Sequence, residues 1–198
     1  MLPSDRKNSA SSGSTGRDPT YEANSRLRAQ GEISSPQVVL VEPEIPPNTG
    51  NIARLCAATG CKLHLVHPLG FQIDEKAVRR AGLDYWHLVT VIEHESWKAF
   101  ELQLSPDARC FFFTGKAKRS CFEVKYETND YLIFGKESEG LSVDILDAHS
   151  SELVAIPTLG GVRSLNLANS VSLGVYEVLR QTGALKSTEL KAISSEKK

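Results

Sequence analysis

Long apolar runs are absent from this chain of 198 residues. No stretch approaches the roughly 18 consecutive apolar residues that a membrane-spanning helix requires, so we expect a soluble protein. The four cysteines form no C-x-x-C pair and no metal-like grouping with the five histidines; they are Cys56, Cys61, Cys110 and Cys121. The sequence therefore predicts reduced, mostly buried thiols in a reducing compartment such as the cytoplasm, and no metal site.

The sequence also lacks a strong net charge and the two common nucleotide-binding fingerprints. Its 23 basic residues nearly balance its 24 acidic residues, which leaves a formal net charge of −1. A nucleic-acid partner would therefore have to bind a local basic patch. No G-x-G-x-x-G follows the first predicted strand, and no G-x-x-x-x-G-K-[ST] occurs in the chain. These absences argue against a nicotinamide-dependent enzyme and against a nucleoside triphosphatase.

The two ends of the chain differ in composition from the middle. Residues 1–36 are rich in Ser, Gly, Asn and charge, with few large apolar side chains, so we predict a disordered N-terminal extension. It has no apolar core of a secretory signal. Its serines and arginines leave a plastid or mitochondrial transit peptide open, although its acidic residues argue against one. Residues 184–198 are interpreted as a polar C-terminal tail, so the folded domain is predicted to span 37–183.

Between the tails, short β-rich segments alternate with helical patterns. The predicted strands are 37–43, 62–68, 87–92, 108–115, 130–135 and 153–157. The predicted helices are 48–60, 74–82, 96–104, 142–148 and a long final helix from Asn166. This alternation is typical of an α/β domain with a mainly parallel six-stranded sheet. Segments such as "CFFF" and "YLIF" are apolar throughout, so we expect helices on both faces of the sheet.

Ligands of such sheets bind beyond the carboxyl ends of the strands, so the segments that follow the strands matter most. The first strand is followed by "EPEIPPNTGNIAR", in which Asn48 or Thr49 can cap a helix. Asn48, Asn51 and Arg54 recur at helical spacing, which favours a shared site. The alternative is that Asn48 is only a cap and Arg54 only an exposed helical residue.

Two further segments follow later strands. In "GKESEGLS", Gly135 and Gly140 permit close backbone approach, while Glu137 and Glu139 argue against a phosphate cradle. In "IPTLGGVRSLNLANS", capping of the final helix explains one polar residue, yet the segment offers four, namely Ser164, Asn166, Asn169 and Ser170. Helix capping alone therefore does not account for all four polar residues.

The three segments resemble a known family. "NTGNIAR", "FGKESEGLS" and "IPTLGGVRSLNLANSVSLGVYE" are similar, in this order, to the three signature motifs of the SPOUT class of RNA methyltransferases, in its SpoU/TrmH group. The resemblance covers about residues 37–183. The runs "EPEIPPNTGNIARLCAATGCKLHLVHPLGF" and "RRAGLDYW" narrow it to the branch that methylates the ribose 2′-hydroxyl of the wobble nucleotide, cytidine or uridine 34, of tRNA.

The resemblance implies a fold, a cofactor and an assembly. The C-terminal segment would be threaded into a deep trefoil knot, and the protein would be a homodimer packed partly through the final helix. The cofactor would be S-adenosyl-L-methionine, with no metal. By residue-to-residue match, the cofactor-binding positions would be Phe113, Thr114, Gly135, Gly140, Ile156, Ser164 and Leu165.

The resemblance also implies catalytic residues, namely Arg54, Asn48, Glu137 and Asn166. Arginine stays protonated in proteins and is a poor base, so we expect Arg54 to orient the ribose hydroxyl and to stabilise the developing alkoxide. Leucine tRNAs are the expected isoacceptors. Methylation of another tRNA position or of rRNA remains open, as does a non-catalytic RNA-binding module on the same fold.

Two basic clusters are candidates for RNA phosphate contacts. "GKAKRS" places Lys116, Lys118 and Arg119 directly after the fourth predicted strand, and "AVRRAG" contributes Arg79 and Arg80. The alternative interpretation is ordinary solvated charge. The position of the first cluster at the carboxyl end of a strand favours RNA contact.

Overall fold

The computed structural model describes residues 26–28, 34–71, 86–162, 164–184 and 191–193. The chain divides into two compact units, of which one is Gly31–Lys186 and the other combines Met1–Gln30 with Ser187–Lys198. Within the second unit, strand β1 (Arg26–Arg28) pairs antiparallel with strand β8 (Lys191–Ile193). The assignment of the two ends as a disordered extension and a polar tail stays a prediction.

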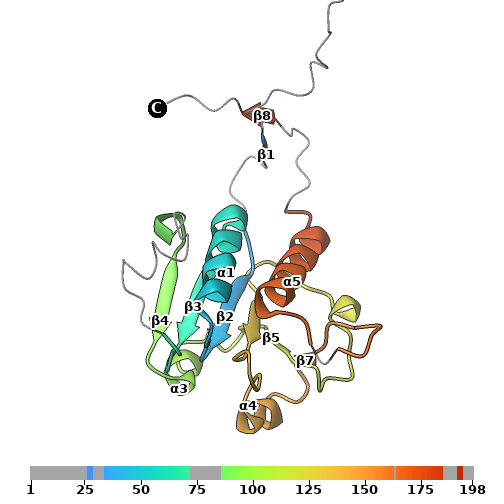
Figure 1. The fold of residues 1–198 in the computed structure, drawn as a ribbon. Helices are drawn as coiled ribbons and strands as arrows, with labels where there is room; N and C mark the ends of the chain where they lie inside the picture. The colour runs from blue at the N-terminus through green and yellow to red at the C-terminus, as the bar shows by residue number, and fades with distance from the viewer. Residues whose placement is uncertain (1–25, 29–33, 72–85, 163, 185–190, 194–198) are drawn as a thin grey trace, which may run out of the picture. The chain divides into compact units, whose positions relative to one another are not determined.

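The larger unit is built on a six-stranded sheet. Its strands are β2 (Gln37–Val41), β3 (Lys62–Val66), β4 (Val91–His94), β5 (Cys110–Phe113), β6 (Tyr131–Phe134) and β7 (Leu153–Val154). Their spatial order is β4-β3-β2-β6-β5-β7, and every neighbouring pair is parallel (Figure 1). The predicted mainly parallel sheet is therefore confirmed.

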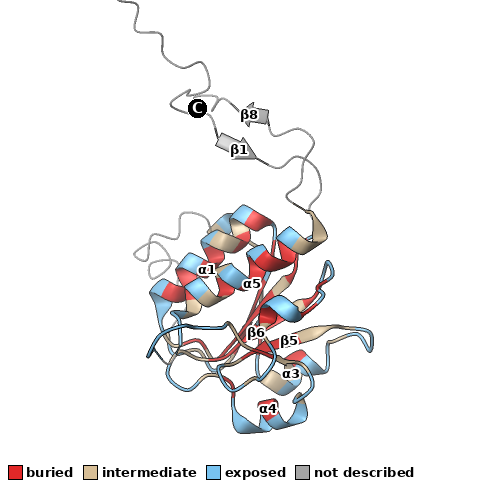
Figure 2. Ribbon diagram, turned by 90° about the vertical axis from the view of Figure 1, so that its right-hand side faces the viewer, coloured by how far each residue is buried: buried red, intermediate tan, exposed pale blue. Residues whose placement is uncertain are grey.

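Helices cover both faces of this sheet. Helices α1 (Pro46–Thr59) and α5 (Leu167–Thr182) pack on one face, and α3 (Trp97–Glu101) and α4 (Val143–Ala148) on the other (Figures 1 and 2). Two short 3-10 turns, η1 (Trp86–Leu88) and η2 (Cys121–Glu123), complete the elements. The predicted helix 74–82 lies outside the described residues. None of the helices in the described ranges is long and apolar enough to cross a membrane.

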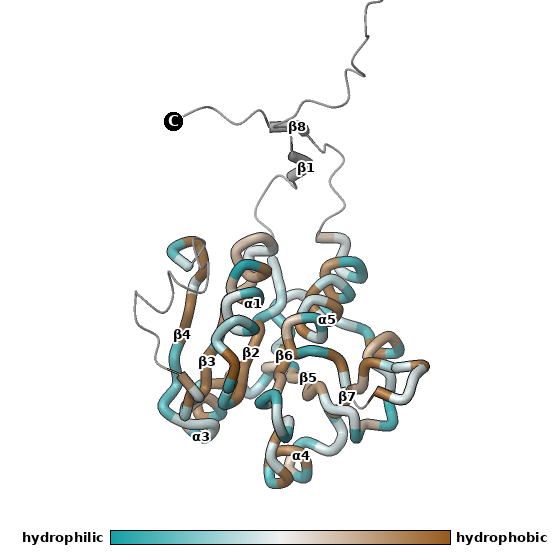
Figure 3. Tube along the Cα trace, in the orientation of Figure 1, coloured by the Kyte–Doolittle hydropathy of each residue, from teal (hydrophilic) through white to brown (hydrophobic). Residues whose placement is uncertain are grey.

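Alternate strand residues enter two separate cores. In β2, Val38 and Leu40 pack in the cluster that contains α1 and α5, whereas Val39 and Val41 pack with α3 and α4. Figure 3 shows the matching hydrophobic colour along the central strands. Because each central strand is buried on both sides, its sequence is continuously apolar rather than alternating. This confirms the interpretation of the apolar runs.

The four cysteines contribute packing rather than cross-links. All four are free thiols, and Cys56, Cys61 and Cys121 are buried. Burial raises the pKa of Cys61 and of Cys121 to about 11, so these thiols stay protonated and unreactive near neutral pH. Within the described part of the chain, no group of three or more His, Cys, Asp or Glu residues could hold a metal ion.

One predicted strand is misplaced. The prediction of a strand at 87–92 is wrong at its start, because residues 86–88 form η1 and β4 begins at Val91. The reason is register. Leu63 of β3 pairs with Val91, and β3 begins only at Lys62, so residues before Val91 have almost no partner strand. Backbone groups that have no neighbouring strand form hydrogen bonds within a 3-10 turn instead.

A pair of histidines lies inside the sheet. His64 of β3 and His94 of β4 are buried, and their rings stack with centroids 5.2 Å apart. Nδ1 of His64 lies 2.9 Å from Nε2 of His94, and Nε2 of His64 lies 3.0 Å from Oε1 of Gln37. Since the amide oxygen only accepts, Nε2 of His64 donates, and Nδ1 of His64 accepts from His94. The arrangement therefore requires a neutral His64.

This pair predicts acid-sensitive stability. Burial, followed by the nearby His94, lowers the pKa of His64 to about 4. An unfolded histidine titrates near pH 6.5, so below that pH the unfolded state binds a proton that the folded state refuses. The contribution of His64 to stability is therefore constant above about pH 6.5 and falls as the pH drops toward 4, by about 2 kcal/mol at pH 5. Urea unfolding across this range measures it.

The matched variants are His64→Gln and His87→Gln. His64→Gln removes the titrating group and keeps polar atoms for Gln37, so its stability should depend less steeply on pH between 6.5 and 5. His87 is exposed in η1, and its replacement should keep the wild-type slope. Equal slopes for wild type and His64→Gln would contradict the prediction.

Candidate active site

Neighbouring strands bring two of the predicted segments together. β2 and β6 are hydrogen-bonded neighbours in parallel register, so residues 42–47 after β2 and residues 135–141 after β6 leave the same edge of the sheet. The segment after β7 leads to the start of α5, which packs beside α1. All three predicted motifs therefore meet at the carboxyl edge, as Figure 1 lets the reader follow.

Glu137 joins the second motif to the first. One carboxylate oxygen of Glu137 accepts from the backbone N–H of Glu44 at 2.7 Å. The other accepts from the Asn48 side-chain amide at 2.9 Å and from the backbone N–H of Ile45 at 3.3 Å. Ile45 is the residue before α1 and has no side chain that can cap the helix. Glu137 therefore places negative charge at the start of α1 and satisfies the two backbone N–H groups that precede the helix.

Asn48 joins the first motif to the third. Its side-chain oxygen accepts from the Asn166 amide at 3.0 Å, while its own amide donates to Glu137. Asn48 is buried and lies inside the first turn of α1 rather than at its N-cap. The interpretation of Asn48 as a helix cap is therefore wrong, and its hydrogen bonds go to the other two motifs instead.

Asn166 has two functions at the start of α5. Its side-chain oxygen accepts from the backbone N–H groups of Ala168 and Asn169, at 2.9 and 3.4 Å, which confirms the predicted helix cap. Its amide group donates to Asn48. The result is a continuous chain of hydrogen bonds, Glu137–Asn48–Asn166, that runs from the loop after β6 through α1 to α5.

Glu44 is a site residue that the sequence analysis did not select. Its carboxylate accepts from the backbone N–H and from the hydroxyl of Ser138, both at 2.9 Å. These hydrogen bonds from Ser138 lower the pKa of Glu44. Glu44 and Glu137 thus each bind the backbone of the other's loop. The only sequence signal was an acidic residue directly after a strand and before the helix-initiating prolines, which is too common to be diagnostic.

The glycines of the second motif have a steric purpose. A Cβ atom on Gly135 would lie 2.1 Å from the carbonyl carbon of Gly140, so no side chain fits there. Gly140 has φ of +77°, in the left-handed region that favours glycine. The loop therefore folds back on itself, closed by the Gly140 N–H to Lys136 C=O hydrogen bond of 2.9 Å. The predicted close backbone approach is confirmed; the predicted cofactor contact is a separate matter that stays open.

The other predicted cofactor positions divide into buried and exposed groups. Phe113 is buried and stacks on Phe134 with centroids 4.4 Å apart, so its ring belongs to the core. Thr114 and Ile156 are half-buried, whereas Ser164 and Leu165 are exposed. Thr114 donates its backbone N–H to the C=O of Val154, which puts the ends of β5 and β7 side by side. These positions follow β5 and β7, but their contact with a cofactor stays a prediction.

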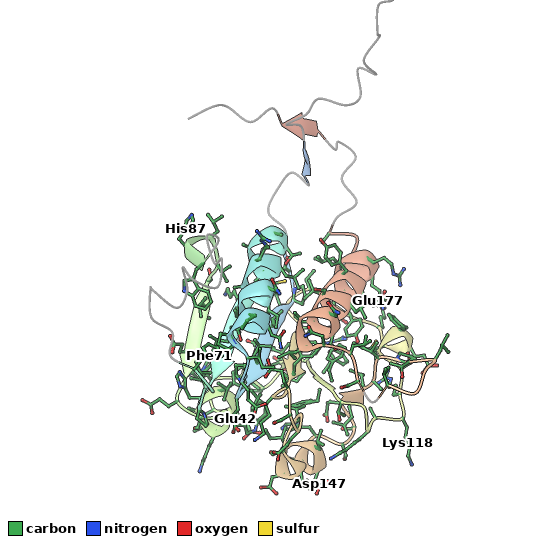
Figure 4. The ribbon with its side chains drawn as sticks, viewed as in Figure 1. Glu42, Phe71, His87, Lys118, Asp147 and Glu177 are labelled. Atoms are coloured by element: carbon green, nitrogen blue, oxygen red, sulfur yellow. The ribbon has the colours of Figure 1, made fainter. Side chains whose placement is uncertain are left out.

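The predicted basic residues lie at the surface. Arg54 is exposed on α1, as is Asn51. Lys116, Lys118 and Arg119 are exposed in the segment that follows β5, and Figure 4 shows Lys118 at the periphery, directed away from the sheet. Arg79 and Arg80 lie outside the described residues.

Comparison with known proteins gives consistent matches. The SpoU rRNA Methylase family matches residues 35–176 of this chain. The chain is 50% identical over 151 residues to the tRNA (cytidine(34)-2'-O)-methyltransferase of Yersinia pestis, over 74% of this chain and 93% of that protein. It is 49% identical over 147 residues to the protein of the same name from Escherichia coli (strain K12), with coverage of 74% and 93%.

A solved structure described as "Structural insights into the 2-OH methylation of C/U34 on tRNA" is similar in fold as well as in sequence. The TM-score is 0.70 at 44% identity, and the match covers 74% of this chain and 95% of that one. The matched share of each relative is nearly its full length, so the likeness extends over the whole sheet and all three motifs.

The hydrogen-bond chain predicts the effect of Asn48→Asp. The change replaces the amide donor by a carboxylate that faces Glu137, so a buried donor is lost and two like charges meet. We expect the free energy of unfolding in urea to fall by about 1–3 kcal/mol at pH 7. Part of that loss should return as the pH falls, because protonation of either carboxyl restores a donor.

Asn51→Asp is the matched control for this substitution. It makes the same chemical change on the same helix at an exposed position, so its effect should stay within about 0.5 kcal/mol. If both variants were equally stable, the chain through Asn48 would contribute nothing to stability.

Proposed function

This chain belongs to the SpoU rRNA methylase family, and we propose that it is an S-adenosylmethionine-dependent tRNA methyltransferase acting on the ribose 2′-hydroxyl of nucleotide 34. The relatives that carry this activity in their names match the chain at about half identity over nearly their full length. The observation in the structure that carries the proposal is the Glu137–Asn48–Asn166 chain. It ties the three family motifs into one rigid edge.

The residues of this edge fit the proposed cofactor. Gly160 and Gly161 have no atom within 4 Å of the position a Cβ would take, so the backbone of this segment is open to a ligand. Leu165 is exposed beside the polar Ser164, and Ile156 is half-buried after β7. A flat base and an amino-acid group need this combination of apolar side chains and free backbone groups. When bound, S-adenosylmethionine supplies a methyl group on a sulfonium; the ribose oxygen gains it as the carbon–sulfur bond breaks and the thioether keeps the electron pair.

Within this proposal, Glu137, Asn48 and Asn166 are positioning residues. Both oxygens of Glu137 already accept hydrogen bonds, and Asn48 uses its amide and its oxygen within the protein. Groups so engaged do not take a proton from the substrate; they fix the loops that bind substrate and cofactor. No metal is proposed, because positioning of the hydroxyl against a good leaving group does most of the work.

Arg54 is the residue that we assign to the ribose. It is exposed on α1, less than two turns after Asn48, and α1 is held by the hydrogen-bond chain. A guanidinium stays charged and donates in a fixed planar geometry, so it suits orienting the hydroxyl and stabilising negative charge on the oxygen. The hydroxyl proton passes to solvent as the bond to carbon forms.

Finer features of the protein belong to the same proposal. The proposal includes the C-terminal trefoil knot of the family resemblance; the segment after β7 lies against the segment after β5, where Ala155 hydrogen-bonds both Arg119 and Cys121. We infer a homodimer through α5, since Leu173 and Tyr176 are 41% and 50% exposed on this otherwise well-packed helix. The RNA would contact Lys116, Lys118 and Arg119. A cytoplasmic location fits a tRNA substrate, and leucine isoacceptors stay the predicted targets.

The test is methyl transfer to tRNA. The protein should transfer label from S-adenosylmethionine to tRNA from a strain without the corresponding enzyme, and nucleoside mapping should locate it on the ribose of nucleotide 34. Arg54→Ala should lower kcat by roughly 100-fold or more, the scale seen when one charge-stabilising donor is lost. Lys62→Ala is the control, because Lys62 is exposed at the opposite edge of the sheet, where β3 begins. Label on a base, label at another position, or full activity of Arg54→Ala would each contradict the proposal.

A further inference from the structure

An exposed aromatic ring lies beside the basic cluster that follows β5. Phe122, in η2, is 50% exposed, although the flanking Cys121 and Val124 are 1% and 4% exposed. The chain therefore turns inward on both sides of Phe122 and leaves its ring at the surface. Apart from Tyr176 on α5, no other aromatic side chain in the described ranges is among the exposed large hydrophobic residues.

The backbone under Phe122 is held rigidly. Ser120 accepts from the Phe122 N–H at 3.2 Å, and Glu123 accepts from the Ser120 N–H at 3.3 Å, which forms a capping box around this single turn. The Cys121 N–H donates to the C=O of Ala155 at 2.8 Å. Exposure of the ring is thus a property of an ordered turn, and a partner would not have to order a loose loop.

A second anchor holds the far side of the turn. Gln181 of α5 donates to the C=O of Val124 at 2.9 Å and accepts from the N–H of Tyr126 at 3.0 Å. With the Ala155 contact, these bonds fix η2 to both the segment after β7 and the end of α5. The ring is therefore fixed relative to the segment after β7, which leads to the proposed active site, and to the last turn of α5.

The residues that flank Phe122 in the sequence are mostly positively charged. Lys116, Lys118 and Arg119 are exposed just before it, and Lys125 is exposed just after it. Glu123 is the one acid between positions 116 and 125, and its carboxylate is engaged by the Ser120 N–H. A cationic strip around a flat apolar ring is complementary to single-stranded RNA, in which phosphates alternate with unstacked bases.

Resting on the proposed function, we propose that Phe122 is a stacking platform for an unpaired base of the tRNA substrate, next to phosphates held by Lys116, Lys118 and Arg119. The anticodon loop that contains nucleotide 34 offers such bases, whereas a duplex keeps its bases stacked on one another. The four cations favour RNA over an apolar protein partner for the same ring. In this role Phe122 holds the loop in place and takes no part in the methyl transfer.

The experiment compares three replacements of Phe122 in the full chain. Binding of an anticodon stem-loop RNA is measured for Phe122→Leu, Phe122→Ala and Phe122→Trp, and KM and kcat are measured with tRNA. Leucine keeps apolar surface but has no aromatic face, so Phe122→Leu and Phe122→Ala should both weaken binding by roughly 5- to 100-fold. Phe122→Trp should keep wild-type affinity. KM should rise while kcat at saturating tRNA stays near wild type.

Two further readouts separate stacking from charge. RNA should quench the fluorescence of the tryptophan added in Phe122→Trp. The wild-type protein, which contains only Trp86 and Trp97, gives the baseline change. Binding is measured at several salt concentrations, and the slope of log K against log salt concentration counts the phosphate contacts. Lys116→Ala and Lys118→Ala should each reduce this slope by about one contact, whereas Phe122→Leu should leave the slope unchanged. Leu88→Ala is the control, because Leu88 is 60% exposed in η1. η1 precedes β4, and β4 and β7 are the two outermost strands on opposite sides of the sheet.

Several results would overturn the inference. Wild-type affinity of Phe122→Leu would exclude stacking, and a change in oligomeric mass on Phe122→Ala would assign the ring to an interface between copies of the chain. If Phe122→Ala does not fold, the comparison of leucine with tryptophan still decides. Normal methylation of nucleotide 34 with unaltered RNA binding by Phe122→Leu would refute the stacking platform alone. Loss of RNA affinity in Phe122→Leu, without methylation of nucleotide 34 by wild type, would refute the proposed function alone.

Discussion

The hydrogen-bond chain from Glu137 through Asn48 to Asn166 is the interaction on which the proposed active site depends. Its two outer members also bind backbone groups: Glu137 accepts from the N–H groups before α1, and Asn166 caps α5. These side chains lie at the starts of two helices and connect three loops. A shift of one loop would therefore break hydrogen bonds to the others. A rigid edge of this kind suits a reaction in which orientation supplies much of the rate.

The parallel sheet makes this chain possible. β2 and β6 are adjacent and point the same way, so the loops that follow them meet without any long excursion. The glycine pair 135 and 140 lets the second loop fold tightly, since a Cβ on Gly135 would collide with backbone. Two hydrogen bonds from Ser138 to Glu44 also connect these two loops. The same hydrogen bonds therefore stabilise these loops and set the geometry of the proposed site.

Away from this edge, the residues that form the cores and the residues that we propose for binding lie in different parts of the molecule. The two cores take the strands' alternate residues, and the hydrogen bond between the buried His64 and His94 requires a neutral His64. The residues that we propose for binding are exposed instead: Arg54 on α1, and Phe122 in the basic turn after β5. Both are attached to ordered backbone, so recognition does not depend on a loop that must first fold.

The sequence by itself determined the sheet, the faces of its helices and the three motif segments, because these depend on local patterns of apolar residues, glycines and caps. The cap at Asn166 and the close approach at Gly135 were readable for the same reason. The start of β4 was not, since it depends on where β3 offers hydrogen-bond partners. Only the tertiary structure decided that Asn48, 89 residues from Glu137 and 118 from Asn166, bonds to both. The same holds for Glu44 and for the exposure of Phe122: long-range partners and burial are set by the packing of distant segments, which local sequence does not encode.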